Sequence, residues 1–367
     1  MRFKFLALAL IVAGAACGIQ SSGIDPNAGV TITGKAVGAD GKPLVARRVV
    51  LIKELDLGEV VGGLFITAAS LGLACLADHP PALCAKNARI TTTESDGSYS
   101  FTVKGSDTQG SFGVASTMEV LTRAPAGDGE AAGPTSLAEF NVQATSLTLP
   151  DLRIWQPKVG LAIDGRATWQ SVPSTHGNSP TYSVEVNDSR GNQWWAAHGM
   201  RPGDRIDPRV LEDISGTFDV MARTRGAANG TTVDWTYVSG AVAVQGHVGA
   251  PPSRRGRCAP LTSNGGVGTF GTCPVTSGAT GGPSQLLNAT NGLVVDLGSL
   301  RSVSFLVLRG CGVPCKMSVS ADLETWTEIA SVSGAYATTT VTPSRTARYL
   351  RVTGSKDLSG LRQVSAW

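Results

Sequence analysis

The sequence predicts an all-β protein built from β-sandwich modules, and three observations support this. Glycine accounts for 45 of 367 residues, about 12 % against about 7 % in an average protein. Charged residues make up only 16 % of the chain, well below the usual ~25 %. Short stretches of alternating apolar and polar residues recur between Gly, Asn, Asp and Pro clusters, as expected of strands joined by tight turns. Helical bundles and coiled coils are excluded, because they need Glu/Lys/Leu-rich heptads.

The charge and the ionisable residues exclude several classes of function. The net charge of +3 is spread evenly along the chain, so no basic surface for nucleic acid is expected. The four histidines, at positions 79, 176, 198 and 247, lack metal-ligand spacing. Glu212 and Asp213 are consecutive, so their side chains are expected to diverge. No G-x-S-x-G, H-E-x-x-H or Walker motif occurs. We therefore predict no catalytic residue, no metal, no cofactor and no enzyme activity.

The N-terminus has the features of an export signal. A basic start, Met1–Lys4, precedes the apolar run Phe5–Ala13, which is too short to anchor the chain in a membrane. The following residues, Gly14–Cys17, resemble the lipobox of bacterial lipoproteins. This resemblance implies a signal peptide over residues 1–17, acylation of Cys17 and a flexible tether over residues 18–29.

Two details of this segment bear on where the protein is expected to be. Gly14 stands where lipoproteins prefer Leu or another branched residue, so cleavage by an ordinary signal peptidase stays open. Gly18 follows the cysteine, where lipoproteins retained at the inner membrane tend to carry Asp. We expect a lipid-anchored protein of the bacterial outer membrane or cell surface, with a periplasmic or secreted protein as the alternative.

The remaining six cysteines are an even number, which in an exported chain indicates a disulfide framework. Fifteen connectivities are possible for six cysteines. Their local spacing favours Cys75–Cys84, Cys258–Cys273 and Cys311–Cys315. A zinc site at the last pair is disfavoured, because no second Cys/His pair lies at a useful distance.

The first module is predicted over residues 30–155. Strands are expected at Thr31–Val37 and Val45–Lys53, and an Asp96-Gly97 turn is expected between two further alternating strands. The stretches ITGKAVGADGKPLVARRVVL and TTTESDGSYSFTV resemble the carboxypeptidase regulatory-like (transthyretin-type) sandwich, a passive scaffold in surface proteins. An insertion over residues 58–86 contains an uncharged apolar run at 60–77. We expect a short helix packed on the sandwich and closed by Cys75–Cys84; a docking patch, a membrane contact or a span are the alternatives.

The second module is predicted over residues 156–248. Its expected strands are Ala162–Trp169, Tyr182–Val186, Gly216–Arg223 and Trp235–Val244, a pattern that resembles a fibronectin type III or immunoglobulin-like sandwich. Trp194 and Trp195 are consecutive and should face opposite sides of their strand. One ring is expected in the core, and the other is expected to be exposed or to cover a neighbouring module; a sugar-stacking platform is the functional alternative.

A linker is predicted over residues 249–257. It contains Arg254, Arg255 and Arg257, which are expected to be solvated or to contact acidic polysaccharide or phosphate.

The third module is predicted over residues 258–367. The segments VDLG (Val295–Gly298), S-x-D-x-x-x-W (Ser320–Trp326) and ARYLRV (Ala347–Val352) occur in this order. Together they resemble the discoidin (coagulation factor C-type) module, a galactose-binding-like jelly roll. We expect Leu297 and Val352 in the core and Trp326 packed across the roll. A discoidin-like module implies binding of carbohydrate or lipid headgroups through loops at one end.

These observations predict a surface-tethered, non-catalytic adhesion protein that binds a glycan or extracellular polymer through its C-terminal module. The candidate ligand-binding residues are Phe270, Arg309, Tyr336, Trp194 and Trp195. The alternative is a structural or accessory subunit of a cell-envelope complex, whose ligand would be an envelope protein. The expected partners are thus a glycan or an envelope protein, and the membrane through the lipid anchor.

Overall fold

The described part of the chain is all-β, with several mainly antiparallel sheets. The computed structural model describes residues 22–53, 88–109, 116–125, 130–172, 178–191, 193–228, 231–276, 292–354, 358 and 360–367. Its helical elements are short 3-10 turns, at Gly105–Thr108, Pro208–Val210 and Pro274–Thr276. None of the helices in these residues has the length and apolar content that a membrane crossing requires. The signal peptide with Cys17, the predicted helix within 58–86 and the pair Cys75–Cys84 lie outside the described residues.

The chain forms two compact units. Unit 1 comprises residues 1–158, 170–182 and 220–241, and unit 2 comprises residues 159–169, 183–219 and 242–367. Two strands of the predicted second module, β12 (Thr181–Asp188) and β14 (Ser215–Ala228), run from one unit into the other. The division into three modules remains a prediction.

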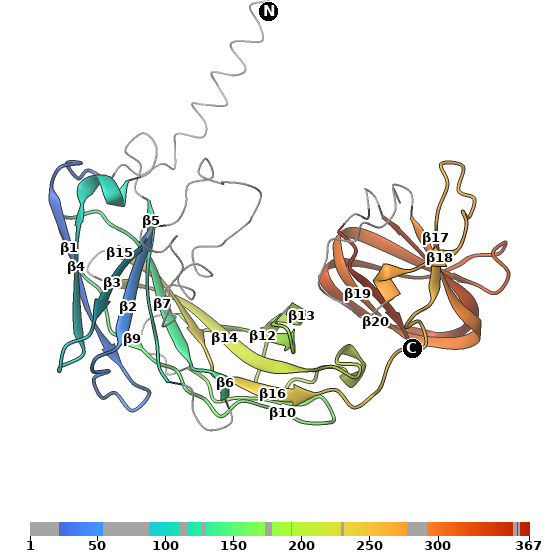
Figure 1. The fold of residues 1–367 in the computed structure, drawn as a ribbon, viewed down its shortest axis with the longest axis horizontal. Coiled ribbons are helices and arrows are strands. Elements are labelled where there is room, and N and C mark those ends of the chain that lie inside the picture. The colour runs from blue at the N-terminus through green and yellow to red at the C-terminus, as the bar shows by residue number, and fades with distance from the viewer. Residues whose placement is uncertain are drawn as a thin grey trace, which may run out of the picture. The chain divides into compact units, whose positions relative to one another are not determined.

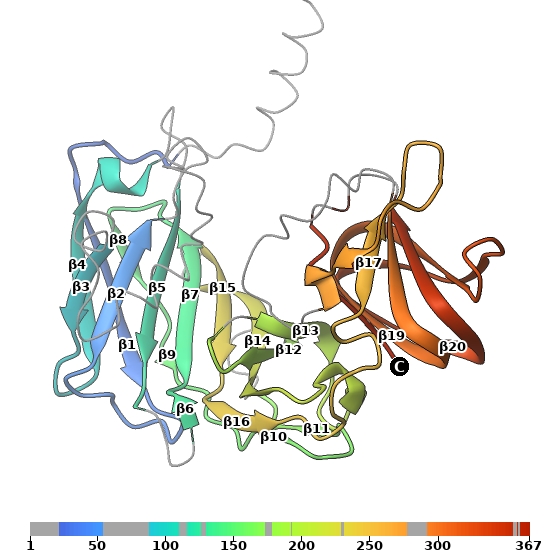
Figure 2. The ribbon, with the colours of Figure 1, turned by 45° about the vertical axis from the view of Figure 1, so that its right-hand side comes forward.

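Unit 1 contains two sheets, which Figures 1 and 2 show in blue to yellow. In one, β1 (Gly29–Val37) pairs antiparallel with β4 (Ser98–Lys104) and parallel with the short β8 (Ser146–Thr148) and β9 (Leu152–Arg153). In the other, neighbouring strands follow the order β3-β2-β5-β7-β15-β14. The bounds of its remaining strands are β2 Arg48–Lys53, β3 Ala88–Thr92, β5 Thr117–Arg123, β7 Thr135–Asn141 and β15 Thr231–Val238. A further short strand, β6, spans Glu130–Ala132.

The Asp96-Gly97 turn forms, but it does not join the two strands of a hairpin. Gly97 N donates to Glu94 O at 3.0 Å, as a tight turn requires. The preceding strand β3 pairs with β2, whereas the following strand β4 pairs with β1. The turn therefore carries the chain from one sheet to the other, and the apolar alternation of both strands fits this arrangement equally well.

The first part of unit 2 also differs from the predicted strand Ala162–Trp169. The structure contains two short strands instead, β10 (Gly160–Leu161) and β11 (Ala167–Thr168), which pair with each other. The turn between them needs Gly165, which has φ +81° and whose added Cβ would lie 1.8 Å from the Ile206 carbonyl oxygen. Strand β13 (Gln193–Met200) pairs with β12, and β16 (Ala241–Gln245) pairs with the start of β14.

The C-terminal part of unit 2 is a β-sandwich formed by β17 (Arg257–Pro260), β18 (Gly271–Thr272), β19 (Leu293–Ser320), β20 (Thr327–Gly354) and β21 (Gln363–Ala366). Strands β19 and β20 bend, so each contributes to both sheets. The register defines one sheet, the β17 sheet, in the order β18, β17, 293–296, 349–354, 315–320 and 327–332. The other sheet, the β21 sheet, contains β21, 306–309 and 336–339.

One hydrophobic core fills the space between these two sheets. Leu297 and Val352 belong to it, with exposed fractions of 4 % and 0 %, as predicted. Trp326 lies elsewhere than predicted: it is half-buried, its indole N–H donates to Leu323 O at 3.0 Å, and the Arg351 guanidinium lies 4.4 Å above its ring. The S-x-D-x-x-x-W segment is a turn, in which Asp322 Oδ1 accepts from the backbone N–H groups of residues 324 and 325.

Candidate functional site

The structure separates the five predicted ligand contacts into two places in unit 2. Arg309, Tyr336 and Trp194 come together beside a pocket, whereas Phe270 lies on a different surface of the C-terminal sandwich. Trp195 is buried, with 7 % exposed.

Trp194 and Trp195 are both covered, although they face opposite sides of β13. Trp194 is 1 % exposed, and its indole N–H donates to the Val210 carbonyl oxygen at 2.9 Å. The guanidinium of Arg309 lies 3.7 Å above the Trp194 ring, a cation–π contact. Neither indole offers a ring face to a sugar, so this pair contributes packing.

Arg309 belongs to a buried polar network, the Arg309 cluster, formed by Arg309, Gln363, Ser365, Glu212 and Arg254. Arg309 Nη1 donates to Gln363 Oε1, and Gln363 Nε2 donates to Glu212 Oε1 at 2.9 Å. The Ser365 hydroxyl donates to the same carboxylate oxygen at 2.7 Å. Arg254 Nη2 forms an ion pair with Glu212 Oε2. Glu212 is fully buried, and a buried carboxylate is tolerated only with such partners.

Two predictions from the sequence change at this cluster. The side chains of Glu212 and Asp213 do not diverge as predicted. Both carboxylates bind Arg254 Nη2, that of Asp213 at 3.2 Å. This is possible because Glu212 has φ +53°, a left-handed backbone that turns its side chain away from the usual direction. Arg254 is not solvated, since only 18 % of its side chain is exposed.

Burial changes the acid–base properties of this region. Desolvation lowers the pKa of Arg309 to about 10, although the nearby Glu212 carboxylate acts in the opposite direction. Burial also raises the pKa of Tyr336. Arg309 therefore stays cationic at neutral pH, and its charge is held at a cost that the surrounding acceptors must offset.

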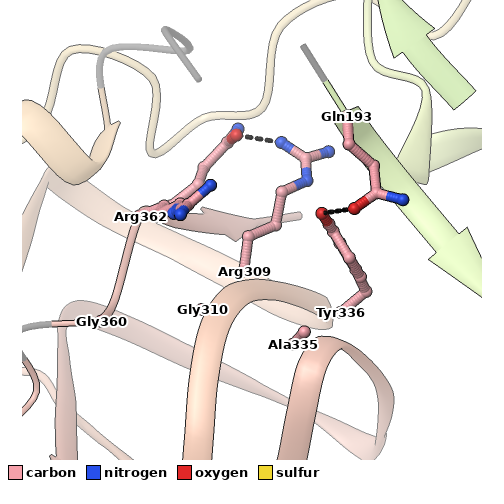
Figure 3. Close-up of a pocket in the computed structure, with 8 residues that line it drawn as sticks. Gln193, Arg309, Gly310, Ala335, Tyr336, Gly360 and Arg362 are labelled. Atoms are coloured by element: carbon pink, nitrogen blue, oxygen red, sulfur yellow. Dashed lines mark hydrogen bonds between the residues drawn. The ribbon is translucent and has the colours of Figure 1, made fainter. Parts of the chain in front are cut away.

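A pocket opens above Arg309, and we call it the Arg309 pocket (Figure 3). Its volume is about 390 Å³, and its lining residues are Gln193, Arg309, Gly310, Ala335, Tyr336, Gly360, Arg362 and Gln363. In Figure 3 the Arg309 side chain rises between Arg362 on one side and Tyr336 with Gln193 on the other. The Tyr336 hydroxyl donates to Gln193 Oε1 at 2.6 Å.

The floor of the pocket depends on a close approach of two chain segments. Gly310 has φ +84°, and a Cβ there would lie 1.8 Å from the Gly360 carbonyl oxygen. The next contact along the same segments is the Arg362 N–H, which donates to the Arg309 carbonyl oxygen at 2.7 Å. Arg309 and Arg362 are thus fixed to one another through their backbones.

The second surface is an open groove at the β17–β18 hairpin, and we call it the Phe270 groove. Its volume is about 630 Å³, and it is lined by Arg255, Gly256, Arg257, Gly271, Thr272 and Cys273. Phe270 lies next to it, half-buried, with its ring centroid 5.9 Å from that of Tyr349. The Arg257 guanidinium donates to the Phe270 carbonyl oxygen. Neither Arg255 nor Arg257 is in an ion pair with any residue that the structure describes.

Two sequence motifs position Tyr349 beside this groove. Arg348 of the ARYLRV segment donates from Nε to Asp296 Oδ1 at 3.1 Å and from Nη2 to Oδ2 at 3.2 Å, and Asp296 belongs to VDLG. Partial burial acts to raise the pKa of Asp296, but the hydrogen bonds from Arg348 and Gly298 outweigh it and the pKa is lowered. Because Leu350 and Val352 point into the core, Tyr349 points outward.

Disulfides hold both surfaces. Cys258 is bonded to Cys273 across the β17–β18 hairpin, with Cα atoms 5.0 Å apart. Cys311 is bonded to Cys315, with Cα atoms 6.3 Å apart. These are two of the three predicted pairs. No group of three or more His, Cys, Asp or Glu side chains that could hold a metal ion occurs among the described residues.

Sequence reasoning missed Gln363, Ser365 and Tyr349. The alternating segment Gln363–Ala366 is apolar at positions 364 and 366, which indicates a strand but not that its polar residues are covered. Tyr349 was within a recognised motif, and only its alternation with the apolar Leu350 and Val352 could have indicated an outward ring.

Comparison with known proteins gives partial likenesses to solved carbohydrate-binding modules. No family model and no curated protein matches the chain. A CBM32 module of a family 31 glycoside hydrolase from Clostridium perfringens is 14 % identical, with a TM-score of 0.19, over 21 % of this chain and 68 % of that one. Chitosan-binding module 1 of a chitosanase/glucanase from Paenibacillus sp. IK-5 is 16 % identical, with a TM-score of 0.24, over 32 % of this chain and 98 % of that one. A further C. perfringens CBM32 module, in complex with GalNAc-β-1,3-galactose, is 12 % identical, with a TM-score of 0.24, over the same shares.

Proposed function

We propose that this protein is a non-catalytic binding protein that recognises a glycan through the Phe270 groove of its C-terminal, discoidin-like module. The observation that carries the proposal is the Phe270–Tyr349 pair, whose rings lie 5.9 Å apart beside an open groove with two arginines outside any described ion pair. The discoidin resemblance of VDLG and ARYLRV supports it, because these are the segments that position Tyr349.

The chemistry of the groove suits a sugar. Aromatic faces carry negative electrostatic potential and pack against the C–H groups on the apolar face of a pyranose ring. Arg255 and Arg257 supply several N–H donors for hydroxyl or carboxylate oxygens. The β17–β18 hairpin holds these groups in fixed positions through the Cys258–Cys273 bond, so little side-chain and backbone freedom is lost on binding.

The protein is also proposed to be attached to the cell surface through its N-terminus. Acylation of Cys17 would hold the chain at the outer membrane or cell surface, with residues 18–29 as a tether and the first two modules as spacers. A shallow site of this kind gains strength when many copies on one membrane engage a polymer together. Substituting Cys17→Ser should release the protein from the membrane fraction, and an unchanged fractionation would contradict the anchor.

A glycan array tests the binding function directly. The full chain, fluorescently labelled away from the groove, should give a reproducible response to a restricted group of glycans. An equally low response to all neutral and acidic glycans would contradict the proposed glycan binding.

A second measurement separates glycan binding from the alternative, an envelope-complex subunit. Under native extraction, a structural subunit would co-purify with a stoichiometric protein partner, and Phe270→Ala would leave that complex intact. A glycan-binding protein should instead lose retention on the immobilised glycan when Phe270→Ala is introduced. Leu300→Ala is the matched control, because Leu300 is an exposed apolar side chain of the same module, 60 % exposed, and its loss should change neither result.

A further inference from the structure

The guanidinium of Arg309 in the Arg309 pocket has no carboxylate in direct contact among the described residues. Arg254 pairs directly with the buried carboxylate of Glu212, whereas Arg309 reaches that carboxylate only through Gln363. Asp213 adds a second carboxylate, but it is half-exposed and binds only Arg254. Buried charges normally have partners of opposite sign, and Arg309 forms no direct ion pair with a carboxylate of the described residues.

Arg309 also has an unused hydrogen-bond donor. Its Nη1 and Nη2 groups donate to Gln363 and to the Val210 carbonyl oxygen, the latter at 3.1 Å. Its Nε–H is buried and has no acceptor among the described residues, while the side chain as a whole is only 2 % exposed. A buried donor without an acceptor is unfavourable, and this one belongs to a residue that lines the pocket.

The rim of the pocket carries groups that suit a polar anion. Arg362 is exposed and in no ion pair within the described residues. The Tyr336 hydroxyl and the Gln193 amide face it across the opening (Figure 3). The volume of about 390 Å³ exceeds what a bare carboxylate fills and falls within the ~300–1,000 Å³ of small-molecule sites.

We propose that the Arg309 pocket binds the carboxylate group of an acidic sugar, such as a uronic acid. The carboxylate lies between Arg309 Nε and the Arg362 guanidinium, and the sugar hydroxyls reach the Tyr336 hydroxyl and the Gln193 amide. The choice of a sugar as the carrier of this carboxylate rests on the proposed glycan binding; the anion site itself rests on the Arg309 cluster. The pocket thus adds a preference for acidic glycans to a protein whose groove engages the sugar rings.

Calorimetric titration of the full chain with glucuronate and with glucose tests this inference. Glucuronate should bind and glucose should bind at least about tenfold more weakly, because only the acid satisfies the buried guanidinium. Arg362→Gln should weaken glucuronate binding by about tenfold. Ala335→Glu places a negative charge at an exposed position of the rim and should abolish it. Arg345→Gln, an exposed arginine of the same module away from the pocket lining, is the matched control and should change nothing.

The outcomes separate this inference from the proposed function. Equal binding of glucuronate and glucose, or glucuronate binding that survives Ala335→Glu, overturns the pocket. If Phe270→Ala loses the glycan-array response but glucuronate fails to bind the unsubstituted chain, glycan binding at the groove is supported and the acidic-sugar site in the Arg309 pocket is contradicted. If glucuronate binds as expected while Phe270→Ala leaves the array response unchanged, the acidic-sugar site in the Arg309 pocket is supported and glycan binding at the Phe270 groove is contradicted.

Discussion

Two of the arginine–aromatic contacts in unit 2 differ in their burial. At the first, Arg309 lies 3.7 Å above Trp194, and both side chains are buried. At the second, Arg348 lies 5.0 Å from the Tyr349 ring centroid, and both side chains are partly exposed. Desolvation lowers the pKa of Arg309, whereas the hydrogen bond to Asp296 raises the pKa of Arg348.

The two contacts show that burial decides whether an arginine–aromatic pair is engaged within the protein or partly exposed to solvent. In the Arg309 cluster most donors and acceptors are engaged within the protein, so the pair fixes one segment of unit 2 against another, and Arg309 Nε lacks an acceptor among the described residues. The Arg348–Tyr349 pair leaves both side chains partly exposed. The buried contact therefore positions the segments that line the Arg309 pocket, whereas Tyr349 of the second contact lies partly exposed beside Phe270.

The largest expected effect comes from removing the acid at the centre of the Arg309 cluster. Glu212→Gln should lower the free energy of unfolding by about 3–5 kcal/mol, because it removes the buried carboxylate near Arg309 and leaves Arg254 with only the half-exposed Asp213. Urea denaturation followed by tryptophan fluorescence measures this. Glu328→Gln, at an exposed position of the same sandwich, is the control and should stay within ~0.5 kcal/mol of the unsubstituted protein. Equal stability of the two variants would mean that the cluster contributes nothing to folding.

The half-buried Asp219, whose carboxylate has a neighbouring acid in Glu185, should destabilise the fold when it is ionised. Burial raises the pKa of Asp219 from 3.8 to about 7, and the neighbouring Glu185 adds to the shift. Between these two values the folded chain binds a proton that the unfolded chain has lost, so the free energy of unfolding should fall as the pH rises from about 4 to 7 and then level off.

Asp219→Asn should flatten this pH dependence and stabilise the protein at pH 8 by up to about 4 kcal/mol. Urea midpoints at pH 5 and pH 8 measure it, with Glu324→Gln, at an exposed position, as the control. A slope that persists in Asp219→Asn assigns the titration to another group.

The disulfide of the groove should matter both for stability and for binding. Replacing Cys258 and Cys273 together by Ser opens a loop with a sequence separation of 15, which corresponds to about 3 kcal/mol in the chain-entropy description. Because the hairpin carries Phe270, glycan affinity should fall as well. Unfolding curves and glycan titrations of the double variant measure the two effects. Retained affinity with lowered stability would place the binding site away from the hairpin.

The smallest expected effect concerns the rim of the Arg309 pocket. Tyr336→Phe removes the hydroxyl that donates to Gln193 at 2.6 Å and should cost about 0.5–1.5 kcal/mol. Differential scanning calorimetry detects a change of this size. A loss as large as that of Glu212→Gln would show that the rim, and not the buried acid, holds the segments together.

Local patterns predicted much of the fold. The alternation of Thr31–Val37 and the motif residues Leu297 and Val352 indicated strands and core positions that the structure contains. Such patterns depend on neighbours a few residues away, and this is why they can be recognised in a single sequence. They did not show that the Asp96-Gly97 turn joins two sheets, because both sheets accept the same alternation.

The candidate site was less accessible to sequence reasoning. Arg309 and Tyr336 were identified as loop contacts, but the burial of Arg309 depends on Glu212 and Gln363, which lie far from it along the chain. Strand alternation correctly predicts that Trp194 and Trp195 face opposite sides. It does not predict that both sides are covered. Contacts of this kind arise only when segments distant in the sequence pack together, so residue types alone do not predict them.

The most direct test of the central claim is a calorimetric titration of Phe270→Ala/Tyr349→Ala with the glycan that gives the strongest array response. The account predicts an affinity at least about tenfold lower than that of the unsubstituted chain, with an unchanged unfolding midpoint, because both rings lie outside the core. An affinity equal to that of the unsubstituted chain would show that the polymer binds elsewhere and would contradict the assignment of the Phe270 groove.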